Sequence, residues 1–276
     1  GKPPDICCKP VILAAIHHMP QGALSGLVAG ERLRLLSYNI QCGMETTQHR
    51  DYFTKSWQHF LPHPVKKQNL DRIATMISDY DVVGLQEIDA GSLRSAFVDQ
   101  TAYLAHKADF GYWHKKVNRD IGHLGQYGNG FLSKIQPHSV HSYRLPGLPG
   151  RGAMVINYGK GKQKLSILLA HLALGQRGRL RQMDFLRELL AESNYNIVMG
   201  DLNCDSGSRP LEQFLEKTGL VETLRGIPTY PSWQPVKKID HILVTEGLVT
   251  ENPAVEDFPL SDHLPVRVDV ILPVSL

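Results

Sequence analysis

The stretch NIVMGDLN at residues 196–203 places a short apolar run directly before a pair of polar side chains. Three apolar residues in succession are typical of a strand buried on both faces, whereas Asp201 and Asn203 are residues that a buried strand usually excludes. A lone Asp or Asn at a strand end is most often part of a turn or a helix cap. This stretch alone therefore predicts a buried strand, and its chemistry depends on what the fold places beside it.

Further apolar runs with the character of strands occur along the chain. They cover residues 33–40, 81–86, 130–135, 152–158, 165–171, 238–244 and 264–272. Polar residues close, interrupt or directly precede several of these runs, at Asn39, Glu87, His171, Asp240, Asp262 and His263. So many polar positions in strands that are expected to be neighbours are hard to explain as turns. They predict one shared site.

Helical patterns separate the strands. Four apolar residues share one helix face by their spacing, namely Leu70, Ile73, Ala74 and Ile77. Similar stripes occur at residues 92–107 and 177–192. A short helix is expected after Ser208, with Pro210 in its first turn and Gly219 as its stop.

No segment has the character of a linker between domains. We therefore expect an N-terminal extension over residues 1–30 and a single domain over residues 31–276. Many strands and fewer helices predict an α+β domain, with two stacked sheets and the helices on the outside.

The composition is that of an ordinary globular protein. Of 276 residues, 42% are hydrophobic and 21% are charged, which excludes a disordered tail, a collagen-like fibre and a disulfide-rich miniprotein. The net charge of +3 is too small to indicate a nucleic-acid-binding domain, but it is compatible with a phosphate-bearing substrate. The apolar run at residues 11–16 is far shorter than the ~20 residues that span a bilayer, so we expect no transmembrane segment.

Four cysteines, at positions 7, 8, 42 and 204, form neither a CxxC pair nor a zinc-finger spacing. We expect free thiols in a reducing compartment, and hence a cytoplasmic protein. Separately, we expect a monomer. Cys42 and Cys204 follow two of the polar strand ends, so both are expected near the site without taking part in the chemistry.

The residue types at the strand ends favour one kind of chemistry. Carboxylate and amide oxygens are hard ligands that prefer Mg²⁺ or Mn²⁺ to zinc. Histidine and aspartate supply acid–base groups and positive charge for a phosphoryl group. The chain contains no HExxH, GxSxG or P-loop motif, so a zinc protease, an α/β-hydrolase and an NTPase lack support.

Seven segments together resemble the endonuclease/exonuclease/phosphatase superfamily, whose fold is that of DNase I. They are LLSYNIQ (35–41), GLQEID (84–89), YGNGFLSK (127–134), LAHLALG (169–175), MGDLNCD (199–205), KIDHILV (238–244) and SDHLPV (261–266). The motifs follow the family's order and span about residues 33–273. The resemblance implies a four-layer α/β/β/α sandwich and a metal-dependent phosphoric ester hydrolase.

The resemblance also implies roles for the acidic and amide residues. Asn39 and Glu87 would lie at the metal, with Glu87 as the main Mg²⁺ ligand, and Asp262 would also touch the metal. Asp201 would orient or deprotonate the attacking water. Asn203 would hold that water or a phosphate oxygen.

Two histidines receive roles in the same way. His171 would contact the scissile phosphate and pair with Asp240. His263 would bind the phosphoryl oxygens, with Asp262 pairing with it or steering it. A carboxylate beside each imidazole would favour its charged form, so we expect a raised pKa at His171.

Other residues are expected to lie outside the catalytic group. Tyr127 and Asn129 are expected to line the substrate cleft, although their Tyr-Gly-Asn-Gly context also suits a turn. Gln41 stands where the abasic-site endonuclease branch usually carries an acidic residue, which lowers the expectation of that activity. His241 is expected to be a buried strand residue.

A basic group near Trp113, formed by Lys115, Lys116 and Arg119, is expected to be a solvated face. Residues 57–64 are interpreted as an irregular insertion that borders the cleft.

The function predicted from these observations is a Mg²⁺-dependent phosphodiesterase that is most similar to a nuclease. Mn²⁺ is the expected substitute metal, and nucleic acid is a candidate substrate. A phospholipid (sphingomyelinase-like) or inositol-phosphate hydrolase is the first alternative. The second is a non-catalytic binding module, which is disfavoured because Glu87, Asp201, Asn203 and His263 are all present.

Overall fold

Two mixed sheets form the centre of the protein. The structure is a computed structural model that describes residues 11–13, 17–18, 27–41, 64–92, 98–120, 126–273 and 275–276. Within these residues, the first sheet has the order β1 (Val11–Leu13), β7 (Ser139–Arg144), β8 (Gly152–Tyr158), β9 (Leu165–His171), β10 (Tyr195–Asp201), β12 (Asp240–Thr245) and β11 (Leu220–Glu222). The second has the order β13 (Val249–Val255), β14 (Val266–Ile271), β3 (Arg32–Asn39), β4 (Val82–Asp89), β6 (Gln126–Ser133), β5 (Tyr112–Asp120) and β2 (His17–His18).

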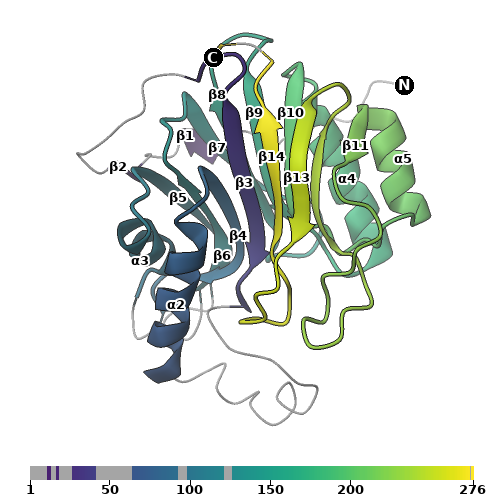
Figure 1. Cartoon of the computed structure of the whole chain (residues 1–276). Helices are drawn as coiled ribbons and strands as arrows, with labels where there is room; N and C mark the ends of the chain where they lie inside the picture. The colour runs from purple at the N-terminus through teal and green to yellow at the C-terminus, as the bar shows by residue number, and fades with distance from the viewer. Residues whose placement is uncertain are drawn as a thin grey trace.

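Helices cover the outer face of each sheet (Figure 1). On the second sheet lie α2 (Pro64–Ile77) and α3 (Gln100–Lys107), and on the first lie α4 (Gln176–Leu190) and α5 (Arg209–Thr218). The main core fills the space between the sheets, with Leu35, Phe131, Ile167 and Met199 among its buried side chains. The expected four-layer α/β/β/α sandwich is therefore confirmed.

Most elements expected from the sequence are present. The stretch 196–203 forms β10 and the turn after it, and the helix after Ser208 begins and ends as expected, with Gly219 in the left-handed conformation at φ 67°. Within the stripe expected at 92–107, of which residues 93–97 lie outside the described residues, α3 begins at Gln100, and the Asp99 side chain accepts hydrogen bonds from two backbone amides of its first turn.

Six described strands were not expected from the sequence, namely β1 and β2 in the segment expected to be an extension, and β5, β7, β11 and β13. β11 and β13 lie at the described edges of their sheets, while β5 and β7 each pair on one side with only a two- or three-residue strand. A strand near an edge exposes much of its surface, so its sequence lacks a strong apolar pattern. In β13, which reads VTENPAV, no residue is buried.

The N-terminal segment contributes to the described sheets. β1 pairs with β7 and β2 pairs with β5, and Leu27 is buried in the core between the sheets. The boundary expected after residue 30 stays a prediction. Among the described residues, no helix is both long and apolar enough to cross a membrane.

The strand register brings the polar ends together. β9 and β10 are parallel with His171 opposite Asp201, and β12 runs antiparallel with Asp240 opposite Asp201. In the second sheet β3 and β4 are parallel, so that Asn39 lies opposite Gln86, directly before Glu87. Both sheets therefore deliver their polar residues to the same end of the sandwich.

Candidate active site

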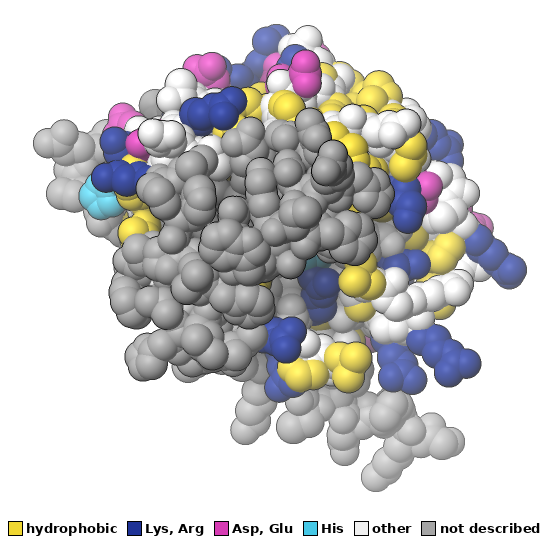
Figure 2. Space-filling view, turned by 90° about the horizontal axis from the view of Figure 1, so that it is seen from below, with side chains coloured by type: hydrophobic (Ala, Val, Ile, Leu, Met, Phe, Trp, Pro, Cys, Tyr) yellow, Lys and Arg dark blue, Asp and Glu magenta, His cyan; other side chains and the backbone are white. Residues whose placement is uncertain are grey.

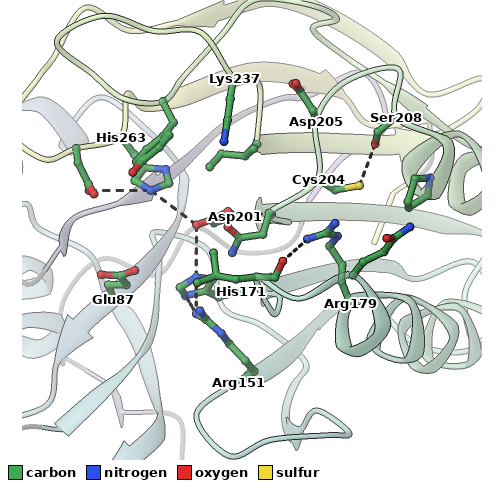
Figure 3. A pocket seen from close by; sticks show the side chains of 17 residues that line it. Glu87, Arg151, His171, Arg179, Asp201, Cys204, Asp205, Ser208, Lys237 and His263 are labelled. Atoms are coloured by element: carbon green, nitrogen blue, oxygen red, sulfur yellow. Dashed lines mark hydrogen bonds and ion pairs between the residues drawn. The ribbon is translucent and has the colours of Figure 1, made fainter.

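A single carboxylate oxygen lies at the centre of the group. Oδ2 of Asp201 is 3.3 Å from Nδ2 of Asn39, 3.4 Å from Nε2 of His171 and 3.8 Å from Nε2 of His263. The other oxygen, Oδ1, accepts a hydrogen bond of 3.0 Å from the backbone amide of Asn203. Figure 3 shows that side chains from both sheets point into one space around this carboxylate.

Glu87 reaches the site through an irregularity in its strand. The pairing of β4 with β6 shifts register between Leu85 and Ile88, and Glu87 has a φ of 55°. A bulge of this kind re-aims a side chain, and a left-handed non-glycine residue costs about 1–3 kcal/mol. Oε1 of Glu87 accepts a hydrogen bond of 3.3 Å from Nδ2 of Asn39. The strand is therefore distorted at the residue expected to be the main metal ligand.

The amide of Asn39 is held on both sides. Its nitrogen faces the carboxylates of Glu87 and Asp201, while its oxygen accepts the backbone amide of Gln41 at 3.1 Å. In this arrangement Asn39 fixes the two carboxylates relative to each other. Its expected place at the metal stays a prediction.

Asn203, like Asn39, is held in place by hydrogen bonds. It has a φ of 49°, and its side-chain amide donates to the carbonyl of Leu172 at 2.9 Å. The residue therefore positions Asp201 through its backbone. Its expected contact with water or phosphate stays a prediction.

Asp240 pairs with His263, and the expected pairing with His171 is wrong. Nδ1 of His263 lies 2.8 Å from Oδ2 and 3.0 Å from Oδ1 of Asp240. Thr229 donates a hydrogen bond of 2.6 Å to the same Oδ2. The strand register places His171 and Asp240 on opposite sides of Asp201, so these two side chains are not neighbours. The loop before β14 instead brings His263 to Asp240.

Asp262 does not hydrogen-bond to His263. Its Oδ1 lies 4.0 Å from Nε2, so it acts on His263 only as a nearby charge. Burial opposes the charged imidazole, but the carboxylates of Asp240, Asp201 and Asp262 outweigh it and hold the pKa of His263 well above its usual value. His263 is therefore the cationic histidine of the site.

His171 has the opposite environment, so the expectation of a raised pKa is wrong. Nη1 of Arg151 lies 2.8 Å from Nδ1 and 2.5 Å from Nε2 of His171. Burial, the charge of Arg151 and the charge of His263 together hold the pKa of His171 well below its usual value. His171 is a neutral imidazole.

Arg151 was not expected in the site. It follows the sequence LPGLPG and directly precedes the strand β8, so it lies at none of the strand ends that the sequence marked with polar residues. Burial lowers the pKa of its guanidinium, against the charges of Asp201 and Glu87, but an arginine retains its charge in proteins. The only available signal was the RGA triplet at 151–153.

Three carboxylates of the site, those of Glu87, Asp201 and Asp262, line the same cavity, and their negative charges favour a cation there. Burial and the negative charges of Asp240 and Glu87 outweigh the influence of His263 and raise the pKa of Asp201 to about 7. The same causes raise the pKa of Asp262 to about 6. Glu87, Asp262 and Asp201 offer hard oxygen atoms, so the donor set fits a divalent cation such as Mg²⁺.

A second group of possible ligands fits a metal less well. Asp201, Asp240 and His263 offer ligand atoms within 4.8 Å of one another. However, Nδ1 of His263 is bonded to Asp240, and its raised pKa leaves the ring without a free lone pair for a metal. We interpret this group as a hydrogen-bonded network beside the cation site.

Two cavities meet at the site. The larger, of about 650 Å³, is lined by seven of the described site residues, namely Glu87, Arg151, His171, Asp201, Asn203, Asp262 and His263. The smaller, of about 540 Å³, shares Glu87, Arg151 and His171 with it. Figure 2 shows lysine and arginine side chains around a hollow on this face of the molecule.

Of the two residues expected to line the cleft, only one does. Tyr127 lines the smaller cavity, as does Arg119 from the basic group. Asn129 is fully buried and donates to the carbonyl of Gly152 at 3.1 Å, so it supports the strand behind the cavity. Its expected contact with substrate is wrong.

The remaining expectations have mixed outcomes. His241 is fully buried and hydrogen-bonded to Glu222 and to the carbonyl of Cys204, as expected. Lys115 lies 2.5 Å from Asp99, so it forms an ion pair rather than a free cation. Cys204 is a buried free thiol on the wall of the larger cavity. Cys42 and residues 57–63 lie outside the described residues.

The fold is that of the DNase I-like phosphoester hydrolases. The family model described as the endonuclease/exonuclease/phosphatase family matches residues 36–263. The chain belongs to that family. No curated protein matches the chain.

Solved structures with the same fold come from several organisms. An endonuclease/exonuclease/phosphatase from Beutenbergia cavernae is 20% identical with a TM-score of 0.69, covering 87% of this chain and 72% of its own. A mannosyl-6-phosphatase from Bacteroides thetaiotaomicron is 17% identical with a TM-score of 0.63, covering 87% and 99%. Sphingomyelinase C from Streptomyces griseocarneus is 18% identical with a TM-score of 0.57, covering 87% and 99%. At these identities the likeness shows the fold.

Proposed function

We propose that the chain is a divalent-metal-dependent phosphodiesterase of the nuclease type, with Mg²⁺ as its cation. The observation that carries the proposal is the position of Asp201, whose Oδ2 lies within 3.8 Å of Asn39, His171 and His263. A carboxylate held between an amide, a neutral imidazole and a cationic imidazole is suited to orient a water molecule and accept its proton.

The cation would be held by Glu87 and Asp262, with Asn39 fixing the orientation of Glu87. When bound, it would withdraw charge from a phosphoryl oxygen and favour attack at phosphorus. The same carboxylates repel a phosphate when no cation is present, so substrate binding should require the metal.

Two cations of the chain itself would stabilise the transition state. His263 is kept charged by Asp240 and faces the cavity through Nε2. Arg151 approaches from the opposite side, at the wall between the two cavities. Fixed positive groups aimed at developing charge are a major source of rate enhancement in buried sites. The neutral His171, between Arg151 and Asp201, would orient the water or a phosphate oxygen by hydrogen bonding.

The experiment is a hydrolysis panel with Mg²⁺ or Mn²⁺ and with EDTA. The substrates are bis-p-nitrophenyl phosphate, plasmid DNA, an abasic-site duplex, RNA, sphingomyelin and inositol phosphates. We expect metal-dependent cleavage of a diester by the wild type and its loss in Asp201→Asn. If the wild type cleaves none of these substrates with either metal, the proposal is wrong.

A further inference from the structure

The larger cavity extends beyond the part that would hold the scissile phosphate. From Asp201 and His263 it continues toward the beginnings of α4 and α5, where Ser208 and Pro210 form part of its wall. Its volume of about 650 Å³ lies within the 300–1,000 Å³ range of sites for whole small molecules. The additional space is therefore large enough for a substituent of the phosphoester.

Two positive side chains face this additional space. Arg179, in the first turn of α4, and Lys237, shortly before β12, both line the cavity. Figure 3 shows the guanidinium of Arg179 and the ammonium of Lys237 pointing into it from different walls. We call the part of the cavity between them the Arg179–Lys237 compartment.

Neither cation forms an ion pair within the described part of the chain. Nη1 of Arg179 donates to the carbonyls of Leu174 at 2.9 Å and Ala173 at 3.4 Å, which anchors the side chain but leaves its charge uncompensated. Lys237 is exposed, and its only described hydrogen bonds are those of its backbone. Both positive charges, the anchored one of Arg179 and the exposed one of Lys237, are therefore available to an anion.

The negative charge of the cavity is concentrated at its other end. Glu87, Asp201 and Asp262 surround the catalytic centre, where His263 and Arg151 face them. In the compartment the acidic residue is Asp205, whose Oδ1 accepts backbone amides from Ser206 at 3.1 Å and Lys238 at 2.9 Å. The compartment therefore has more positive than negative charge.

The N-termini of α4 and α5 add partial positive charge to the compartment, although a helix N-terminus alone does not make a binding site. At the beginning of α4 stands Gly175, which has no side chain to cap the helix, and its first turn contains no acidic residue. Ser208 before α5 makes no capping bond, and its hydroxyl lies 3.1 Å from the thiol of Cys204. The first turn of α5 contains Glu212, which forms an ion pair with Arg225. Uncapped helix N-termini carry partial positive charge.

We infer that the Arg179–Lys237 compartment binds a second phosphate group, carried by the substituent of the scissile phosphoester. The inference rests on the proposed function, since it assigns the scissile phosphate to the centre around Asp201. The cations there already match a single phosphate, and Arg179 and Lys237 have no described acidic partner that would explain them. The substrate is therefore a molecule with at least two phosphates.

Two sources share this chemistry. A nucleotide chain offers a second phosphate on the same sugar, and a phosphorylated polyol offers one on the same ring. The compartment recognises the second phosphate in either case, so the group attached to it must be identified by comparison of matched ligands.

The test measures equilibrium binding by calorimetry with Mg²⁺ in the Asp201→Asn background, so that no turnover is needed. The ligand pairs are thymidine 5′-phosphate with thymidine 3′,5′-bisphosphate, and inositol 1-phosphate with inositol 1,4-bisphosphate. Because hydrogen bonds to charged groups are among the stronger ones, we expect the second phosphate to tighten binding by about 10- to 100-fold in one pair. The pair that shows this gain identifies the source.

Substitutions test whether the increase in affinity from the second phosphate depends on the compartment. Lys237→Met and Arg179→Met should each reduce the ratio of the two affinities to near one, and Arg179→Lys should retain part of it. The matched control is Arg187→Met, an exposed arginine in the last turn of α4 that lines neither cavity of the site, and it should leave the ratio unchanged.

Three results would overturn the inference. They are equal affinities within both ligand pairs, a gain that survives Lys237→Met together with Arg179→Met, and a gain that is lost equally in Arg187→Met. Because binding is measured in a variant without turnover, these results are separate from the hydrolysis panel. Hydrolysis of diesters by the wild type, together with no gain in affinity in the Asp201→Asn variant, would contradict the compartment alone.

Discussion

Nδ1 of His263 lies 2.8 Å from Oδ2 of Asp240, with both side chains almost fully buried. Thr229 donates to the same oxygen at 2.6 Å, and its backbone carbonyl accepts the amide of Leu264 at 2.9 Å. Thr229 therefore connects the loop of His263 to the strand of Asp240. This arrangement fixes the ring so that Nε2 faces Asp201 at 3.8 Å.

Asp240→Asn should lower the pKa of His263 and reduce activity most at high pH. Burial opposes the imidazolium, and the raised pKa of His263 depends first on the charge of Asp240. Below that pKa the ring is charged, and activity that depends on the charge is lost as the pH rises through it. Removal of Asp240's charge should therefore move the alkaline limb of the pH–rate profile to lower pH. We expect turnover at pH 8 to fall by about 10²–10⁴.

The measurement is a pH–rate profile at saturating Mg²⁺, together with an NMR titration of the ring protons of His263. Thr229→Val is the companion variant, because it removes the hydrogen bond to Asp240 but not the charge, and it should shift the profile in the same direction by less. An unchanged titration of His263 in Asp240→Asn would contradict the pairing.

A double-mutant cycle should couple Asp240 with His263 and not with His171. Groups that act as one unit lose activity non-additively, so Asp240→Asn/His263→Ala should be little slower than the slower single variant. Asp240→Asn/His171→Ala should lose activity closer to multiplicatively, since His171 contacts Arg151 and Asp201. Initial rates of the wild type, the single variants and both doubles decide the matter. Equal coupling in both cycles would show that the hydrogen bonds in the site do not determine the functional pairs.

Glu87→Gln should weaken Mg²⁺ binding while the fold remains intact. The side chain lies in both cavities rather than in the core between the sheets, so its charge serves the site. Removing one negative ligand from a hard-cation site lowers affinity, and we expect at least a tenfold loss. Calorimetric titration with Mg²⁺ provides the measurement, and a thermal melt provides the control for folding. Equal affinity in the variant and the wild type would exclude Glu87 from the metal site.

Mg²⁺ affinity should also rise with pH as the nearby carboxylates lose their protons. Burial is the first cause of the raised pKa values, about 7 at Asp201 and about 6 at Asp262. A bound cation favours the charged carboxylates, so binding below these values must release protons. Calorimetry at pH 6 in two buffers of different ionisation enthalpy should detect this release, and at pH 8.5 it should be close to zero. The same release at both pH values would contradict these assignments.

The fold could be predicted from the sequence because the central strands are buried on both faces. β9 and β10 each contain a short apolar run, and the alternating strand β14 places Val266, Val268 and Val270 in the core. Edge strands such as β13 could not be predicted, because exposed positions carry no apolar pattern. The residues of the site could be predicted largely because most of them stand at the ends of these central strands.

The partners within the site could not be predicted in the same way. Which carboxylate meets which histidine depends on the loop before β14, which brings His263 within 2.8 Å of Asp240 and leaves His171 to Arg151. The sequence carries no periodic signal for such a loop. Asn129 illustrates the reverse error, because a polar residue in a motif that suits a cleft turned out to support a strand behind it.

Arg151→Met should reduce activity and raise the pKa of His171. Burial is the first cause of the low pKa of His171 and would persist, but the charge of Arg151 is the second, so the pKa should rise only in part. Loss of a positive group aimed at the phosphate should reduce kcat/KM by about 10²–10³. Arg151→Lys should recover part of the activity, and because it retains the charge it should keep the pKa of His171 low. The measurement combines steady-state kinetics with NMR titration of His171 in all three proteins. If Arg151→Met loses activity while His171 titrates as in the wild type, Arg151 acts on the substrate alone and the contact between the two side chains has no electrostatic role.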